Sequence, residues 1–568
     1  MKYLIKRKNQ MILSSNKVFV TIASSMILAS CGSPSIISVP IENIDSIPLK
    51  NMDLTENQLK NWNSFDLVSD TIPGMSVNKA YTELIQNKKG QKVIVGVIDS
   101  GVDIEHEDLK EVVWTNPKEI KGNGKDDDNN GYVDDIHGWN FLGDSEDENL
   151  EFVRIMKKLK PKYTGKTLAS VAEVDRGEYQ NYIEAKAEFE KEYQENSGQK
   201  IQYEQILQLS EASHKAISAA LGKEDYSKEE LLKTEAKTAE MQQYVAFLAQ
   251  MFGFMDPGDT IPDFIKSIKE GIDHFTEQLN YNLNAEFDGR TVVGDNVDDI
   301  TDTKYGNSNV MGPDPKKEGL KHGTHVAGII AAKRNNGKGM NGVAQNVEIM
   351  AIRAVPNGDE YDKDIALALR YAVDNGAKVI NTSFGKYYST HPEWVREAIR
   401  YAASKDVLIV NAAGNEGTDL DQKAVYPNDQ TDNNTEIADN FITIGALNYV
   451  YGSNLVADFS NYGKSNVDAF APGVKIWSTT PNNSYEYLQG TSMAAPAVAG
   501  VAALIRSYFP SLKAAQVKQI LMDSGLNTKT SVVIGGEQTN VGSFSNLSKS
   551  GKMVNLYNAF IMADKLSK

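Results

Sequence analysis

The chain has 568 residues, of which 41% are hydrophobic and 24% charged, a composition that is typical of globular proteins and argues against intrinsic disorder. Its formal net charge of −17 makes nucleic acid and anionic membrane surfaces poor electrostatic partners. Its single cysteine, Cys31, excludes an intramolecular disulfide. The length fits one large α/β domain with insertions, or two to four ordinary domains.

The first 31 residues have the pattern of an export signal. A basic start precedes a mainly apolar run at residues 18–30, which is too short to span a bilayer comfortably. The run ends in Leu-Ala-Ser-Cys-Gly, which resembles the bacterial lipobox, whose cysteine is lipidated. We therefore expect a lipoprotein signal peptide over 1–31. The mature chain would be exported to the bacterial cell envelope and held to a membrane by lipid on Cys31. Outer membrane and cell surface both stay open, and the alternative is a secretory signal with an incidental cysteine.

Beyond a tether and irregular approach segment at 32–75, the pattern becomes that of an α/β domain. Near-continuous apolar runs, typical of buried parallel strands, lie at 92–98, 347–355, 379–382, 407–412 and 441–446. Helical patterns lie at 362–375, 392–404, 491–508 and 513–524. This alternation predicts a parallel sheet covered on both faces, formed by residues 76–145 and 319–568.

Residues 146–318 interrupt that alternation. Patterns rich in Glu, Lys and Gln predict a mostly helical insertion, with amphipathic helices at 176–195, 202–221, 227–251 and 262–279. The insertion leaves and re-enters the α/β domain between two of its predicted site motifs. It is therefore either a lid, exosite or gate over the site, or a peripheral decoration.

Three motifs supply a carboxylate, an imidazole and a hydroxyl in a fixed order. They are V-I-D-S-G-V-D around Asp99, H-G-T-H-V-A-G from His322, and G-T-S-M-A-A-P around Ser492. A serine hydroxyl is a poor nucleophile unless a base takes its proton and an acceptor orients that base. Ser492 also opens an apolar helix, and the free amides of a helix N-terminus can stabilise a developing oxyanion.

With these motifs the chain resembles the subtilisin-like serine proteases (subtilase family), in a bacterial lipoprotein form, over about residues 90–145 and 319–565. The resemblance implies a three-layer subtilisin-like α/β fold with a mostly parallel central sheet, to which this chain adds the large helical insertion. It also implies that Asp99 orients the imidazole, that His322 is the general base and then acid, and that Ser492 is the nucleophile. A fourth motif, A-A-G-N-E-G, implies that Asn415 donates to the oxyanion.

The resemblance further implies where substrate binds. Ser383, Phe384 and Gly385 would pair with an extended peptide as an added strand, and Ala412 and Gly414 would form the opposite wall of the main specificity pocket. Lys386 stands where family members usually have glycine, so we expect it to narrow the pocket or to place a charge there.

An acidic run at 122–135 predicts a calcium loop. Asp126, Asp128 and Asn130, followed by glycine, match the start of a calcium-binding sequence. The Tyr132 carbonyl and Asp134 or Asp135 would complete the ligand set. The final glutamate of an EF-hand is missing, so the loop is not an EF-hand. We expect structural calcium and no cofactor for catalysis; the alternative is a solvated acidic turn.

Together these features predict an exported, lipid-anchored serine endopeptidase that hydrolyses peptide bonds of proteins through an acyl-enzyme at Ser492. Its partners would be protein or peptide substrates and a membrane, not nucleic acid. The segment between Cys31 and the first strand looks short for a folded prodomain, so a separate inhibitor or chaperone is an open expectation. The alternatives are a catalytically idle binding or assembly protein on a protease fold, or a peptide ligase or cyclase that uses the same triad.

Overall fold

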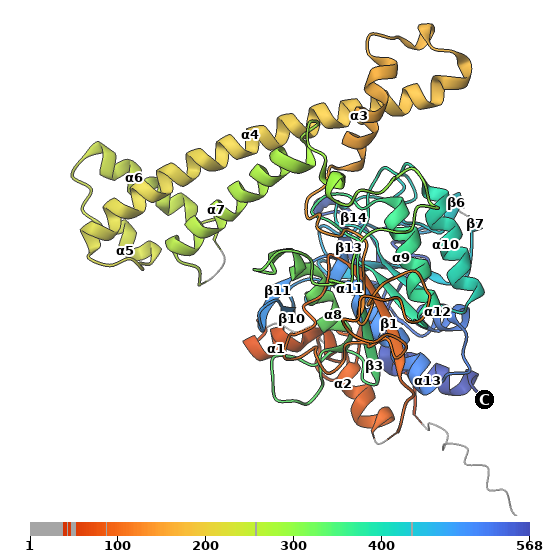
Figure 1. The fold of residues 1–568 in the computed structure, drawn as a ribbon. Coiled ribbons are helices and arrows are strands. Elements are labelled where there is room, and N and C mark those ends of the chain that lie inside the picture. Colours follow the sequence, from red (N-terminus) through yellow and green to blue (C-terminus); the bar gives the residue numbers. More distant parts are fainter. Residues whose placement is uncertain (1–37, 43, 47–52, 87, 256–257, 433–434) are drawn as a thin grey trace, which may run out of the picture. The chain divides into compact units, whose positions relative to one another are not determined.

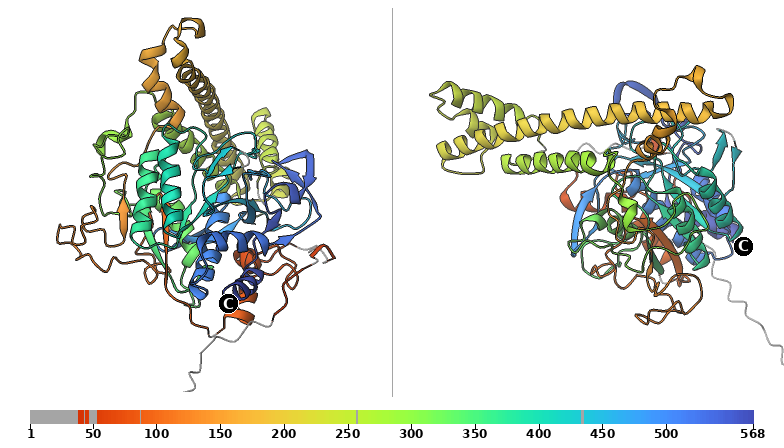
Figure 2. Two further views of the ribbon diagram at one scale, coloured as in Figure 1. Left: turned by 90° about the vertical axis from the view of Figure 1, so that its right-hand side faces the viewer. Right: turned by 45° about the horizontal axis from the view of Figure 1, so that its top comes forward.

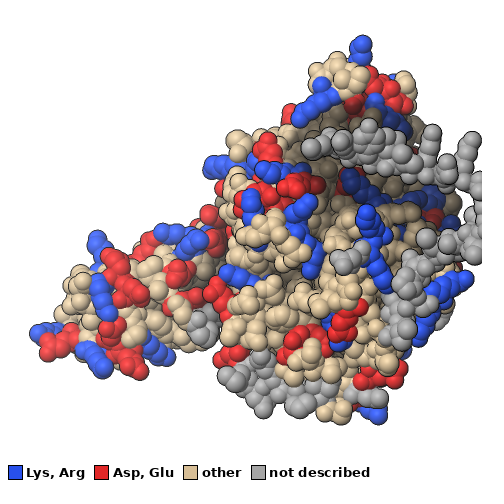
Figure 3. Space-filling model, turned by 90° about the horizontal axis from the view of Figure 1, so that it is seen from below, with Lys and Arg blue, Asp and Glu red and all other residues tan. Residues whose placement is uncertain are grey.

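The computed structural model describes residues 38–42, 44–46, 53–86, 88–255, 258–432 and 435–568 (Figure 1). The predicted signal peptide and Cys31 lie outside the described residues. Within the described ranges, no helix is both long enough and apolar enough to cross a membrane. On the face of the molecule in Figure 3, acidic and basic side chains are interspersed.

A nine-stranded sheet forms the centre of the α/β domain, in the order β12-β15-β9-β8-β5-β4-β1-β3-β2. Its neighbouring strands run parallel except where β12 pairs antiparallel with β15. The five predicted apolar runs form five adjacent strands of this sheet, β8-β5-β4-β1-β3. The strands are β1 (Val93–Asp99), β2 (Gly138–Asn140), β3 (Val347–Arg353), β4 (Val379–Thr382), β5 (Leu408–Ala412), β8 (Phe441–Leu447), β9 (Ala469–Pro472), β12 (Leu526–Asn527) and β15 (Lys552–Met553).

Helices cover both faces of this sheet, which confirms the predicted fold class (Figures 1 and 2). On one face, α9 (Asp362–Asp374) and α10 (Pro392–Ser404) form a continuous apolar core with strand residues such as Ile98 and Ile380. On the other, α8 (Lys321–Ala331) and α11 (Thr491–Tyr508) pack together and against the strands. Both helices are rich in small residues, and a Cβ on Gly328 would come within 2.2 Å of the Thr479 hydroxyl. Small residues such as Gly328 therefore let α8 pack closely against β10 (Ile476–Thr480).

Smaller elements complete the α/β domain. Three two-stranded ribbons pair β6 (Gln430–Asp432) with β7 (Thr435–Glu436), β10 (Ile476–Thr480) with β11 (Ser484–Leu488), and β13 (Ser531–Ile534) with β14 (Glu537–Ser543). Two further helices, α12 (Ala514–Asp523) and α13 (Leu556–Leu566), pack against each other and against α11.

The approach segment is more ordered than its composition predicts. It contains α1 (Glu56–Asn61) and leads into α2 (Val77–Ala80). Trp62 is 1% exposed, and its Nε1–H donates to the Val474 carbonyl at 3.0 Å. The Leu556 amide donates to the Met75 carbonyl at 2.9 Å. The partners lie about 400 residues or more further along the chain, so no local pattern reveals them.

The insertion consists mainly of helices: α3 (Glu151–Tyr163), α4 (Arg176–Leu221), α5 (Lys228–Leu232), α6 (Ala239–Met251) and α7 (Ile261–Glu277). The two helices predicted at 176–195 and 202–221 are one 46-residue helix, α4. The helix predicted at 227–251 is two, because the Thr238 side chain accepts a hydrogen bond from the Met241 amide and starts α6 afresh. Helix α3 was not predicted. Figure 1 shows α6 and α7 lying along α4.

The insertion has two apolar clusters and buried ion pairs with the α/β domain. One cluster joins α3 to the start of α4, and the other joins the end of α4 to α5, α6 and the start of α7. Where the chain returns, Arg290 pairs with Asp364 of α9 at 2.6 Å, and Lys363 pairs with Asp295 at 2.7 Å. These four side chains are nearly or fully buried, so the returning end of the insertion is fixed to α9.

Candidate active site

Asp99 and His322 are in direct contact at the carboxyl end of the sheet. Asp99 is the last residue of β1 and is 1% exposed. Its Oδ1 lies 2.7 Å from His322 Nδ1, in the first turn of α8, and also accepts the Ser100 amide. The surroundings of the imidazole disfavour its charged form, but the Asp99 carboxylate outweighs them and raises the pKa of His322. The ring is therefore oriented and made more basic by Asp99.

A glycine makes this contact sterically feasible. A Cβ on Gly323 would lie 2.1 Å from the Gly101 carbonyl oxygen and 3.1 Å from the Asp99 side chain. The other histidine of the motif, His325, is buried, and its Nε2 contacts the carbonyl oxygens of Ile476 and Glu486. Burial lowers the pKa of His325 to about 3, so this ring is a neutral packing group.

Ser492 begins α11 and faces the same cleft as His322. Its hydroxyl donates to the Ser383 carbonyl at 3.1 Å, and the Ser383 hydroxyl donates to the Ser492 carbonyl at 2.9 Å. The structure thus places Ser492 with His322 in one cleft, with the hydroxyl turned toward Ser383. Among the described residues the Ser492 hydroxyl bonds to Ser383 and not to His322, and a catalytic hydrogen bond of this kind often tightens only with substrate.

Asn415 presents its side-chain amide to the cleft. Its Oδ1 accepts hydrogen bonds from the Thr491 amide at 2.8 Å and from the Thr491 hydroxyl at 3.1 Å. Because the Thr491 amide can only donate, the atom facing it must be the oxygen of Asn415. This orientation leaves Nδ2 as the hydrogen-bond donor that Asn415 can offer to the cleft.

The cleft has a volume of about 700 Å³ and collects the predicted substrate-binding residues. Ser383, Phe384, Gly385, Ala412 and Gly414 all line it, together with the four residues above. Gly414 has φ of +101°, and a Cβ there would come within 2.4 Å of Asn461. The A-A-G-N-E-G motif therefore depends on glycine at this position.

Lys386 does not narrow the pocket or charge it in the way expected from the sequence. Its side chain is 1% exposed and is turned away from the cleft lining. The Nζ lies 3.1 Å from Asp362, 3.4 Å from Glu151 of α3, and donates to the Glu360 carbonyl at 2.7 Å. Burial alone would favour the neutral amine, but the Glu151 and Asp362 carboxylates raise the pKa of Lys386. Its charge is thus neutralised internally.

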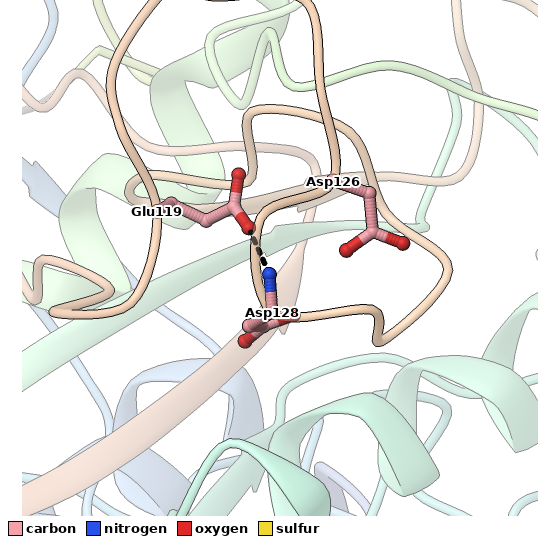
Figure 4. A group of neighbouring side chains, drawn as sticks. All are labelled: Glu119, Asp126 and Asp128. Atoms are coloured by element: carbon pink, nitrogen blue, oxygen red, sulfur yellow. Dashed lines mark hydrogen bonds between the residues drawn. The ribbon is translucent and has the colours of Figure 1, made fainter.

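The acidic loop brings together fewer of the predicted ligands than the sequence suggested. Asp126 and Asp128 lie with Glu119 so that one oxygen of each is within 4.8 Å of the others (Figure 4). The Glu119 Oε1 accepts the Asp127 and Asp128 amides, whereas its Oε2 is buried without a hydrogen-bond partner in the described part of the chain.

The other predicted ligands have different contacts. The Asn130 side chain accepts the Tyr132 amide and donates to Asp135. Asp134 accepts three backbone amides, from residues 122–124. Burial raises the pKa of Asp135 to about 6, and its carboxylate is bonded to Asn116, Asn130 and Tyr371. The Tyr132 ring packs edge-on against Trp139, and the Tyr132 carbonyl stays a predicted ligand. Glu119 was missed because it precedes the recognisable loop motif.

Much of the cleft wall is formed by residues that the sequence did not predict. Glu277 and Tyr281, at the end of the insertion, line the cleft, as do Asp359 and Glu360 after β3. These residues belong to no motif. The alternation of strands and helices indicated where the cleft would form, but not which loop side chains would reach it.

Comparisons with known proteins identify the family of this chain. The model of the subtilase family matches residues 90–548. A thermophilic serine proteinase from Bacillus sp. (strain AK1) is 45% identical over 188 residues, which are 33% of this chain and 42% of that protein. Subtilisin DY from Bacillus licheniformis is 37% identical over 245 residues, 42% of this chain and 84% of that protein. A cell wall-associated protease from Bacillus subtilis (strain 168) is 39% identical over 218 residues, 38% of this chain and 22% of that protein.

Removing the Asp99 charge should lower the pKa of His322, because that carboxylate is what raises it. We expect this fall in Asp99→Asn, measured by NMR titration of the histidine ring signals in a Ser492→Ala background that prevents self-digestion. Glu105→Gln, which removes an exposed carboxylate nearby, is the matched control and should leave the titration unchanged. An unchanged pKa of His322 in Asp99→Asn would show that the 2.7 Å contact does not set its basicity.

Proposed function

Because the chain belongs to the subtilase family, we propose that it is a serine endopeptidase that hydrolyses peptide bonds of proteins. The observation that carries the proposal is the 2.7 Å Asp99–His322 contact in the same cleft as Ser492 and Asn415. The chain spans less than half of the first relative's length, so activity, substrates and partners are inferred for this chain from its own site.

In the proposed reaction, His322 removes the proton of Ser492 Oγ as that oxygen attacks the substrate carbonyl. Asp99 holds the ring so that Nε2 faces the cleft, and it stabilises the positive charge that forms on the imidazole. Asn415 Nδ2 and the Ser492 backbone amide donate to the oxyanion. His322 then gives the proton to the leaving amine. In the second half of the reaction, His322 takes a proton from water as the water attacks the acyl-enzyme, and it returns this proton to Ser492 Oγ.

We also propose that the acidic loop holds a structural calcium ion. Glu119, Asp126 and Asp128 offer carboxylate oxygens, the ligands that Ca²⁺ prefers, and the buried Glu119 Oε2 has no hydrogen-bond donor in the described part of the chain. A cation would satisfy that oxygen and offset the repulsion among three carboxylates. Asp134 and Asp135 support the loop through their hydrogen bonds rather than as ligands.

We further propose that the chain is exported and anchored to a membrane by lipid on Cys31. The basic start, the short apolar run and the Leu-Ala-Ser-Cys-Gly sequence support export, cleavage before Cys31 and lipid attachment to its thiol. The chain would then act at a membrane of the bacterial envelope.

If Ser492 is the nucleophile, Ser492→Ala should reduce casein hydrolysis to background and abolish labelling by a fluorophosphonate probe. Asn415→Ala should lower kcat by about 10²–10³ with a small change in KM, the loss typical of removing an oxyanion donor from an enzyme of this family. Ser484→Ala, which removes an exposed hydroxyl on β11, is the control. An unlabelled wild-type protein would favour the idle binding protein, and ligated products in the mass spectrum would favour a ligase or cyclase.

Calcium should raise the Tm of the chelator-treated protein, because the ion would bind the folded loop and not the unfolded chain. We expect Asp126→Asn and Asp128→Asn to lose this rise. Asp127→Asn should keep it, since Asp127 bonds instead to the Ile120 amide and the Asn123 side chain. A Tm that does not respond to calcium in the wild type would refute the site.

Lipid attachment should appear as incorporation of labelled palmitate into the protein expressed in a bacterial host. Cys31→Ser should lose the label and move from the membrane fraction to the soluble fraction, whereas Ser492→Ala should keep both. Absence of label from the wild-type protein, with export intact, would favour the ordinary secretory signal.

A further inference from the structure

The two ends of the insertion meet at one wall of the cleft. This wall is formed by residues 357–360, which follow β3 and line the cleft. The Asn357 carbonyl accepts the Glu148 amide at 3.0 Å and the Asn282 side-chain amide at 2.8 Å, and Asn282 also donates to the Glu148 carbonyl at 2.8 Å. Asn282 is fully buried, so residues before α3 and after α7 together hold the start of this wall.

Arg154 of α3 holds the rest of the wall. Its guanidinium donates to the Asp359 carbonyl at 2.8 Å and to the Glu360 carbonyl at 3.0 Å. It also donates to the Glu151 carboxylate at 2.8 Å and lies 3.9 Å from the centre of the Tyr361 ring. Because these contacts use the planar fork of the guanidinium, a lysine could not reproduce them. Arg154, oriented by Glu151, therefore fixes the main chain of the wall.

Lys386 connects the same part of the insertion to a second segment of the cleft lining, residues 383–385. Its Nζ donates to the Glu360 carbonyl at 2.7 Å and lies 3.4 Å from Glu151. The Lys386 main chain pairs with Tyr426 in both directions, at 2.9 and 2.8 Å. The residue that follows the second segment is thus held both by the insertion and by Tyr426.

Near these fixed points, the main chain of both segments has groups that can bind a peptide. Phe384 and Gly385 make no main-chain hydrogen bond to any residue that the structure describes, and the same holds for Gly358. All three line the cleft. The Ser383 carbonyl accepts from Ser492 Oγ at 3.1 Å, so the second segment begins beside the nucleophile. Such main-chain groups are what an extended peptide needs in order to add to a protein as a strand.

We propose that Arg154, oriented by Glu151, is a positioning residue for substrate binding, because it helps to hold the main-chain segments with which an extended peptide would pair. This inference rests on the proposed endopeptidase function. It makes the base of the insertion part of the substrate groove. Asp99, His322 and Ser492 belong to β1, α8 and α11, so the reacting groups are held without Arg154.

The test compares two ester substrates with the same leaving group and the same amino acid at the scissile bond, an acylated single residue and an acylated tetrapeptide. We expect the wild type to prefer the tetrapeptide, because only that substrate spans the groove. Arg154→Met should lower the ratio of the two kcat/KM values by about tenfold or more, while the rate of labelling by a fluorophosphonate stays within about twofold of the wild type.

Two further variants are matched to this one. Arg154→Lys keeps the charge but not the planar fork, so it should lower the ratio less than Arg154→Met does. Arg176→Met, which removes an exposed arginine of α4, should leave the ratio as in the wild type. A general loss of active protein affects both substrates equally, so only a change in the groove moves the ratio.

A wild-type ratio near one, or an unchanged ratio in Arg154→Met, would overturn the inference while leaving the endopeptidase intact. If Arg154→Met does not fold, Asn282→Ala at the other end of the insertion should lower the same ratio. Failure of the wild type to react with the fluorophosphonate would instead refute the proposed function itself.

Hydrogen exchange completes the test without any change in the insertion. In full-length Ser492→Ala, a saturating peptide that contains the same tetrapeptide should slow amide exchange at 357–360 and 383–386 and also at 148–154, because the three stretches are held together. Slower exchange at 383–386 without any change at 148–154 would show that the groove binds substrate independently of the insertion, and would overturn the inference.

Discussion

The contact between Asp99 and His322 is the constraint on which the rest of the site depends. It requires α8 to begin against the end of β1, at a backbone distance that no side chain on residue 323 would permit. The parallel sheet provides this meeting point because the carboxyl ends of its strands share one edge. Thus the glycine of H-G-T-H and the buried strand before Asp99 serve packing and chemistry together.

The same edge of the sheet explains how a large insertion can be accommodated. The chain leaves the α/β domain before α3 and returns after α7, and both ends are fixed by buried charges such as Arg290 with Asp364. The cluster at the far end of α4 has its own buried residues, including Ile217 and Leu248, and needs no contact with the cleft. The insertion therefore combines a base that lines the cleft with a distal part that is stabilised separately.

The sequence predicted the elements whose signals are local. The strand β4 and the helices α10 and α11 match the predicted ranges, because their apolar periodicity is decided by burial on the sheet. Helix α4 was split in the prediction because Gly198 and polar neighbours interrupt the pattern, but that stretch is mainly exposed or half-buried and tolerates them. The burial of Trp62 and the place of Glu277 in the cleft depend on contacts hundreds of residues away, which no local pattern contains.

Lys386 shows why a motif can identify a site without giving its electrostatics. From the sequence, a lysine in place of glycine adds a positive charge beside the substrate. In the structure that charge is balanced by Asp362 and Glu151, and its amine holds the Glu360 carbonyl. Lys386 thereby ties the base of the insertion to the start of α9. The positive charge of Lys386 is therefore balanced inside the protein before it can reach the cleft, which the motif alone does not reveal.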